Sequence, residues 1–533
     1  MQNAGGVNEC RRSRTGIDGR KWRTVAAVAA LGLIAAACSS ASHSSTAGSA
    51  KAAGTGTGTG TLTVAFPAAP TTLDPTKANQ SSATFLQLAY DSFVRLDANG
   101  AFSPDLATSW GYVGSGNKTF DMTLRSGVRY SDGSPVTTAS VVAYLDYLRS
   151  SQAAPFLSGA TIDQIGTDKV EIKMTAPYPS IPFQFSQYNV IGDPIGPTGM
   201  ANQSALGHST DGAGEYTLDT ASTVANSQYV YTPNPYYWNK AAVHYGKVVI
   251  RIIATPQSEI DALKTGQANV ALVGPDLSVA PAAKAAGLQL IGSPSIFEGL
   301  LLADRSGQMS KPLGDVRVRQ ALNYAVNRSA ITAALTAGYG TPTDETVPVG
   351  ADGDSTALHN YYPYDPAKAK QLLAQAGYPN GFQLDVASEA GVATVLQAIA
   401  GQLAAVGVKL NVVNLAYNVY ATDVLEAKYP AAGVALGAGP MTFEYTFLFA
   451  PTAPFNPFHT TDTTLTSLTN QMLTASQSAL PGIDQKIENY LVANAWLVPV
   501  SFVPIMYYAQ QSVGGIAVTP SAPLPTITDW YQK

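Results

Sequence analysis

The residue types that most often carry chemistry are scarce in this chain of 533 residues. Only two cysteines occur, Cys10 and Cys38, so nothing after residue 38 offers a disulfide, a thiol nucleophile or a thiolate ligand for zinc. The five histidines are dispersed and form no HExxH-type pair. We therefore expect no metal site and no cofactor.

Three short motifs of serine and lysine are typical of acyl-transferring enzymes. They are SGNK at 115–118, SDG at 131–133 and KTG at 264–266, and they resemble the signatures of penicillin-binding proteins and β-lactamases. That chemistry needs a serine at the start of a helix, whereas Ser115 lies in a glycine-rich turn before an expected strand. A serine acyl-transferring enzyme is a remote alternative, and we expect no enzymatic activity.

A further chemical signal near the N-terminus concerns lipid attachment. Six basic residues at 11–23 precede an apolar run at 25–37, which as a helix rises only about 20 Å and cannot cross a bilayer core of about 30 Å. This pattern predicts a secretory signal peptide. The run ends in Ile-Ala-Ala-Ala-Cys at 34–38, which resembles a bacterial lipobox and implies cleavage before Cys38 and lipidation of this residue.

Composition narrows the class of protein and its partners. Apolar residues make up 46% of the chain and charged residues 13%, with a formal net charge of −5. These values favour large cores and exclude a disordered or coiled-coil protein, and they do not favour nucleic acid as a partner. Residues 38–60 are almost all Ser, Thr, Ala and Gly, which predicts a flexible tether.

The elements that would position a site alternate between strands and helices. A strand is expected at 61–66 and a helix at 81–94, and a strand, helix and strand at 247–273 predict a βαβ unit with parallel pairing. After residue 305 the same alternation predicts a second α/β domain. Its expected helices are 316–335, 365–376, 392–406 and 417–427, its strands are 382–388 and 408–413, and a last helix is expected at 484–495.

Seven segments, in order along the chain, match the habits of one family. The two most specific are PLGDVRVRQALNYAVNRSAI at 312–331 and YDPAKAKQLLAQAGYPNG at 364–381. The departures from the family habit are Ser140, Asn269 and Asn327, where Asp is usual, and Glu215, where Pro is usual. The chain resembles the large extracellular solute-binding proteins of ABC importers, family 5, which bind oligopeptides, dipeptides or nickel. The other matching segments are 104–110, 119–142, 212–218, 234–238 and 263–272.

The resemblance implies an α/β fold of the two-lobe periplasmic-binding-protein type (type II, large cluster C), with an extra subdomain in the first lobe. The lobes would close on a ligand about hinge segments near 300–306 and 476–492. The implied organisation is a signal peptide at 1–37, a tether at 38–60, a first lobe at 61–300 with the subdomain at about 82–205, a second lobe at 301–480, and a return to the first lobe at 481–533.

Ligand pockets of this architecture lie between the lobes, where strand ends meet. Four loops there carry aromatic or acidic residues: 66–73, 295–300, 414–420 and 437–449. In peptide-binding relatives an Asp in the region of the last loop pairs with the peptide's amino terminus, and here the only acid is Glu444. Glu444 either pairs with a ligand or is solvated. The candidate ligand-binding residues are Phe66, Phe297, Glu298, Tyr417, Glu444, Tyr445 and Phe447.

The implied function is that of an exported monomer, lipid-anchored at the outer face of the cytoplasmic membrane. It would capture a small solute, a peptide first of all, and deliver it to the transmembrane subunits of an ABC permease. Arg11-Arg12 leaves open whether export uses the general secretory or the twin-arginine route. A receptor of the same fold that binds a nickel complex or a sugar, or that signals without transport, also stays open.

Overall fold

The computed structural model describes residues 58–533. The predicted signal peptide, Cys38 and most of the predicted tether lie outside these residues. At the centre is a mixed sheet of eleven strands, in the order β15-β14-β16-β12-β17-β11-β1-β10-β9-β8, with β13 paired to β17. Its strands are β1 (Thr61–Phe66), β8 (Tyr216–Leu218), β9 (Gln228–Pro233), β10 (Lys247–Ile252), β11 (Val270–Gly274), β12 (Gln289–Leu301), β13 (Thr341–Pro342), β14 (Phe382–Ser388), β15 (Val408–Asn414), β16 (Ala431–Gly437) and β17 (Leu497–Ala509).

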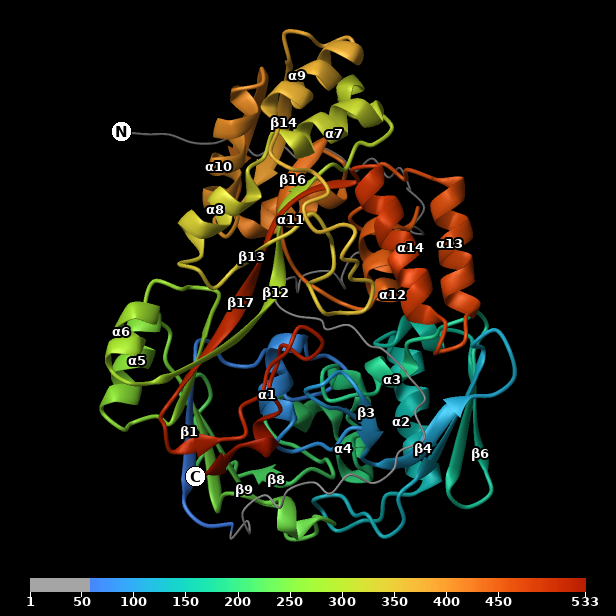
Figure 1. Ribbon diagram of the computed structural model, residues 1–533. Helices are drawn as coiled ribbons and strands as arrows, with labels where there is room; N and C mark the ends of the chain where they lie inside the picture. Colours follow the sequence, from blue (N-terminus) through green and yellow to red (C-terminus); the bar gives the residue numbers. More distant parts are fainter. Residues whose placement is uncertain (1–57) are drawn as a thin grey trace, which may run out of the picture. The chain divides into compact units, whose positions relative to one another are not determined.

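Two long strands, β12 and β17, belong to both lobes (Figure 1). They pair antiparallel from Gln289 to Leu301, and the register shifts at two places, between Pro294 and Ile296 and between Glu298 and Gly299. The side chain of Ile296 packs in the core of the first lobe, whereas that of Leu300 packs in the core of the second. The chain therefore passes between the lobes at these irregular points of β12.

The return to the first lobe lies on β17. Val498 and Val500 pack in the second-lobe core, and Val503 and Ile505 pack in the first-lobe core. The sequence placed this return at residue 481 and a hinge at 476–492. Packing favours a later crossing, because the helix before β17 is still held to the second lobe by a hydrogen bond from the Tyr362 hydroxyl to the Val492 carbonyl (2.7 Å).

In the first lobe, β1 lies between β10 and β11 and pairs parallel with each of them. The predicted strand–helix–strand unit forms, with α5 (Pro256–Lys264) as its helix, and its two strands are parallel. They do not pair with each other, because β1 occupies the position between them. The other helix on this side is α6 (Ala280–Ala285).

A four-stranded sheet, in the order β4-β5-β7-β6, forms the extra subdomain together with α2 (Thr138–Ser151). Thr137 caps this helix, and Ser140 completes a reciprocal capping box, so Ser140 has a structural role at this position. The strands are β4 (Ala107–Tyr112), β5 (Thr119–Leu124), β6 (Thr161–Ile165) and β7 (Lys169–Lys173), with β2 (Val94–Leu96) and β3 (Phe102–Pro104) in a separate pair nearby in sequence.

The expected helix at 81–94 is mostly wrong. The α-helix α1 covers only Ala83–Leu86, all of it buried. The chain leaves the helix at Gln87, whose side-chain amide donates to the Gln187 carbonyl (3.2 Å) and whose amide oxygen accepts from the Ile527 backbone N–H (3.3 Å). Tertiary partners of a buried polar side chain thus override the helical pattern. Two further short helices are α3 (Ile181–Gln184) and α4 (Pro197–Ala201).

The second lobe shows the predicted alternation, with one correction. The expected single helix at 316–335 is two helices, α7 (Val316–Tyr324) and α8 (Arg328–Leu335). The break occurs because Asn327 starts a new helix, its side chain accepting from the Ala330 backbone N–H (3.0 Å). The remaining helices of this part are α9 (Pro366–Gln375), α10 (Ala393–Ala404) and α11 (Tyr417–Leu425).

After β16 the described chain forms three α-helices, α12 (Met441–Glu444), α13 (Thr463–Thr474) and α14 (Leu480–Ala493). The last begins four residues before the expected Asp484. The chain ends with a short pair, β18 (Val513–Gly514) and β19 (Tyr531–Gln532). Among residues 58–533, no helix has the length and apolar character needed to span a bilayer.

Candidate functional site

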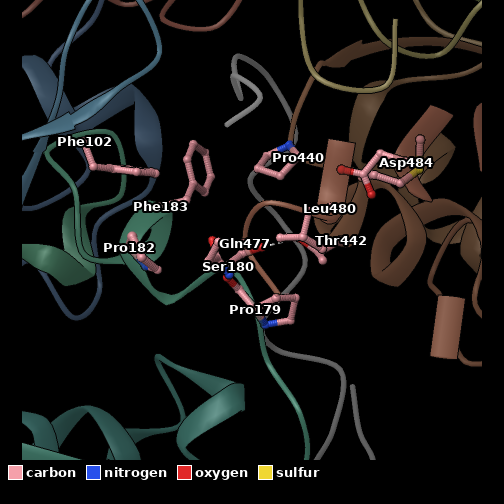
Figure 2. A pocket seen from close by; sticks show the side chains of 11 residues that line it. Phe102, Pro179, Ser180, Pro182, Phe183, Pro440, Thr442, Gln477, Leu480 and Asp484 are labelled. Atoms are coloured by element: carbon pink, nitrogen blue, oxygen red, sulfur yellow. Dashed lines mark hydrogen bonds between the residues drawn. The ribbon is translucent and has the colours of Figure 1, made fainter. Parts of the chain in front are cut away.

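A small cavity of about 30 Å³, partly open to solvent, is lined by residues from both lobes (Figure 2). The first lobe and its subdomain contribute Phe102 and the segment from Pro179 to Phe183, and the second lobe contributes residues of α12 and α14. Ligand sites in proteins are concave and mostly apolar with few polar groups, which fits this lining. The full set is Phe102, Pro179, Ser180, Pro182, Phe183, Pro440, Met441, Thr442, Gln477, Leu480 and Asp484.

The two walls of the cavity touch through polar contacts. The hydroxyls of Ser180 and Thr442 are 2.5 Å apart, and the Gln477 side-chain amide donates to the Pro179 carbonyl (3.0 Å). A third contact lies further along the same side: the Asn117 side-chain amide donates to the carbonyls of Leu473 (3.0 Å) and Ala475 (2.7 Å) at the end of α13. These bonds hold the lobes against each other beside the cavity.

Among the described residues, the one charged side chain that lines the cavity is Asp484, near the start of α14. Its carboxylate points towards Pro440 (Figure 2). Asp484 is 6% exposed, and its Oδ1 has no hydrogen-bond partner among the described residues. Burial raises the pKa of Asp484 to about 8, and the nearby charge of Asp352 adds to the shift. A cation in the cavity would supply the partner that this carboxyl group lacks.

The predicted loop at 437–449 borders the cavity, but its acid is engaged elsewhere. Pro440, Met441 and Thr442 line the cavity. Glu444 is 4% exposed, and its Oε1 accepts from the Gly439 backbone N–H (3.0 Å), so it holds its own turn together. Burial raises the pKa of Glu444 well above its usual value, the bond from Gly439 opposes this, and Glu488 adds to it.

The aromatic candidates of the same loop form a small stack. The rings of Phe443 and Phe447 are stacked with centroids 5.2 Å apart, and Phe447 also contacts Phe455 at 5.0 Å. Phe443 packs on the core of the first lobe and so bridges the two walls. Tyr445 lies between Phe443 and Phe447 in the sequence, and its side chain is half-buried. The stacked rings follow the lining residues Pro440–Thr442 in the sequence, but they are not among the residues that line the cavity.

The remaining candidates lie on other elements. Phe66 and Phe297 are buried, against Phe85 (5.0 Å) and Phe502 (5.8 Å) respectively. Glu298 sits at a register shift of β12, and burial raises its pKa to about 7 against the lowering by a hydrogen bond with Ser501. Tyr417 begins α11 and is 44% exposed. None of the seven candidates is among the described residues that line the cavity, and their contact with a ligand stays a prediction.

Sequence reasoning missed Asp484, although a signal was present. Along α14, Asp484 shares one buried helical face with Ile487, Glu488 and Leu491. Charged residues on the apolar face of an amphipathic helix are unusual and call for a partner. A search for such acids would have found Asp484 and Glu488 together.

The three motifs of the enzyme alternative lie on separate elements. Ser115 and Lys118 are exposed in the turn between β4 and β5, and Ser131 precedes α2. Lys264 ends α5 and pairs with Asp261 (3.0 Å). In the first of these turns, Asn117 makes the contact between the lobes described above.

Comparisons with known proteins agree with this architecture. The model for bacterial extracellular solute-binding proteins, family 5 (middle region), matches residues 101–457. The glutathione-binding protein GsiB of Escherichia coli O1:K1 / APEC is 32% identical over 364 residues, covering 64% of this chain and 67% of that protein.

Solved structures confirm the two-lobe fold. The ABC transporter-associated periplasmic binding protein DppA from Helicobacter pylori, in complex with peptide STSA, superposes with a TM-score of 0.71 at 19% identity, covering 89% of this chain and 98% of that one. NikZ from Campylobacter jejuni, in complex with Ni(L-His), gives 0.70 at 18% identity, covering 89% and 99%. The chain belongs to family 5 of the bacterial extracellular solute-binding proteins, as its seven matching segments predicted.

Proposed function

We propose that this protein is the substrate-binding protein of an ABC importer. It acts as an exported monomer, anchored by lipid on Cys38, that holds a small solute between its lobes and presents it to the permease. Family membership supports the role. The main observation behind this proposal is the cavity lined by residues of both lobes.

The mechanism is a shift between conformations without any bond being made or broken. A ligand that contacts both walls binds the arrangement in which they meet more tightly than the one in which they are apart. Taking a population from 1:99 to 99:1 requires about 10⁴-fold tighter binding of the favoured state, about 5.5 kcal/mol. Contacts to Phe183 on one wall and Asp484 on the other would supply this difference.

The ligand that fits best is a peptide or peptide-like solute with a protonated amine. Asp484 offers a carboxylate oxygen without a hydrogen-bond partner within the described part of the chain. The rest of the lining is mostly apolar and includes two phenylalanine rings, Phe102 and Phe183, which suit the body of such a molecule or the face of its cation. The names of GsiB (glutathione-binding) and DppA (complex with a peptide) add support.

The test is to identify what the protein binds. The chain is purified without denaturation, its bound small molecules are released and identified by mass spectrometry, and each is returned to ligand-free protein in a calorimeter. We expect amine-bearing solutes of peptide type, bound one per chain and released unaltered. Only solutes without a cationic group, or a chemically altered product, would contradict the proposal.

The lipid anchor has its own test. Exported wild-type protein should partition with the membrane and carry label from a radioactive fatty acid. The Cys38→Ser variant should lose the label and appear in the soluble fraction. A variant that keeps both the label and the membrane fraction would refute lipidation at Cys38.

A further inference from the structure

A cluster of ligand-type side chains lies outside the cavity, in the segment 343–359 that connects β13 towards α9. It brings together Glu345, Asp354 and His359, and one donor atom from each lies within 4.8 Å of the other two. The imidazole Nε2 of His359 is 2.7 Å from Asp354 Oδ1 and 3.5 Å from Glu345 Oε1. These three residues lie within 14 positions of one another, but their spacing follows no regular pattern that would predict a site.

Each carboxylate is oriented by a backbone N–H. The Ser355 N–H donates to Glu345 Oε2 (3.1 Å), and the Gly350 N–H donates to Asp354 Oδ2 (2.8 Å). The other oxygen of each group is thereby left facing the imidazole. Such outer hydrogen bonds are what orients ligands in metal sites.

Glu345 contributes a buried carboxylate to the cluster. Its side chain is 1% exposed, and its Oε1 points into the cluster. Among the described residues, the ion-pair partner of this oxygen is His359, whose Nε2 lies 3.5 Å away. A buried carboxylate oxygen in this state is costly unless a cation meets it.

The surroundings add negative charge and little positive charge. Glu488 of α14 is fully buried nearby and accepts from the Thr346 hydroxyl (2.6 Å). Arg328 pairs with Asp344 of the same segment (2.9 Å). Among the ion pairs of the described residues, those of Glu345 and Asp354 are with His359 only, and Glu488 has none.

We infer that Glu345, Asp354 and His359 form a binding site for a divalent transition-metal ion of the zinc or manganese class. One imidazole nitrogen with two carboxylate oxygens suits these ions, whereas calcium and magnesium prefer oxygen ligands throughout. Ligand atoms around tetrahedral zinc are about 3.3 Å apart for bonds of about 2.0–2.1 Å. The observed separations of 2.7 and 3.5 Å bracket this value, so small side-chain movements would admit the ion.

The ion would replace the proton shared by His359 and Asp354. Water would fill the remaining coordination positions of the ion, because both side chains reach the surface, with 38% and 16% exposure. It would fasten the segment 343–359, which also donates to Glu488 from the Thr346 backbone N–H (2.5 Å), against α14. The inference does not depend on what binds in the cavity between the lobes.

The test uses the full chain, stripped with a chelator and titrated separately with Zn²⁺, Mn²⁺ and Ca²⁺ while binding is followed by calorimetry and melting by fluorescence. We expect one Zn²⁺ or Mn²⁺ equivalent that raises the melting temperature, and no comparable effect of Ca²⁺. The His359→Gln and Asp354→Asn variants should each bind that equivalent at least about tenfold more weakly. Both substitutions keep the side-chain volume close to the original.

The matched control is His459→Gln, which alters an exposed histidine whose Nδ1 lies 2.9 Å from the Pro451 carbonyl. It should bind the metal like the wild type. Equal Zn²⁺ binding by wild type and His359→Gln, or the absence of any saturable equivalent, would overturn the inference. Cobalt replacement gives a second readout, since a visible d–d absorption in the wild type should vanish in the His359→Gln variant.

Discussion

Two buried acids near the cavity, Glu444 on α12 and Asp484 on α14, differ in what they bind. Both are nearly inaccessible to solvent, at 4% and 6% exposure. Glu444 accepts a hydrogen bond from its own turn, whereas Asp484 has an oxygen without a partner in the described structure and lines the cavity. Burial alone therefore does not distinguish a ligand-binding acid from a structural one, and the partner of each oxygen does.

Replacing Asp484 should have the largest effect. In the Asp484→Asn variant an amine-bearing ligand loses its charged partner, which costs about 2–5 kcal/mol and weakens binding by at least about thirtyfold. Calorimetry with the ligand identified from the purified protein measures this. The control is Glu259→Gln, a fully buried acid on α5 whose two oxygens also lack partners within residues 58–533. Similar losses in both variants would remove Asp484 from the site.

The affinity should also depend on pH. Because the pKa of Asp484 is about 8 without ligand, its carboxyl group is mostly protonated at pH 6–7 and must release a proton to pair with an ammonium group. Binding should thus weaken by up to about tenfold for each pH unit below 8, until the ligand-bound pKa is reached. Heats measured in buffers of different ionisation enthalpy would report proton release, and no release would contradict the role of Asp484.

A smaller effect is expected at the contact between the lobes. The Asn117→Gly variant keeps the positive φ of 51° accessible but removes two hydrogen bonds to the end of α13. At about 1 kcal/mol in total, ligand affinity should fall about fivefold. Asn226→Gly, at another residue of positive φ (61°), is the control. Unchanged affinity for Asn117→Gly would mean that this contact does not contribute to the ligand-bound arrangement.

The smallest effect should come from Glu444→Gln. Burial raises the pKa of Glu444 well above its usual value and so favours the neutral side chain, and glutamine can accept the same bond from Gly439. We expect ligand affinity within about twofold of the wild type and a change in unfolding free energy below about 1 kcal/mol. A large loss of affinity would reverse the comparison and restore Glu444 as the ligand's partner.

The sequence predicted the family, the two-lobe α/β fold and most regular elements, because strands such as β14 and helices such as α9 follow simple periodicity. It erred where one polar side chain decides the local structure, as Gln87 does for α1 and Asn327 for α7 and α8. Ser140 and Asn327 depart from the family pattern and still stabilise helix starts: Asn327 caps α8, and Ser140 completes the capping box of α2 with Thr137.

The candidate site was predicted less well. The loop at 437–449 does border the cavity, but the face of α14 that carries Asp484 becomes part of the lining only through contacts between distant segments. The proximity of Glu345, Asp354 and His359 could not be predicted either, because the segment that contains them forms no helix or strand and has no sequence periodicity.

The two register shifts in the β12–β17 ladder have a mechanical consequence. Elsewhere the ladder is regular and resists bending, so we expect a torque between the lobes to twist the chain at Pro294–Gly299 and at the facing residues of β17. Because the two strands are paired, we expect them to twist together and to define a single hinge axis between the lobes. Glu298 lies on that hinge. Because burial raises its pKa to about 7, the charge of Glu298 would change near neutral pH and alter the stiffness of the hinge.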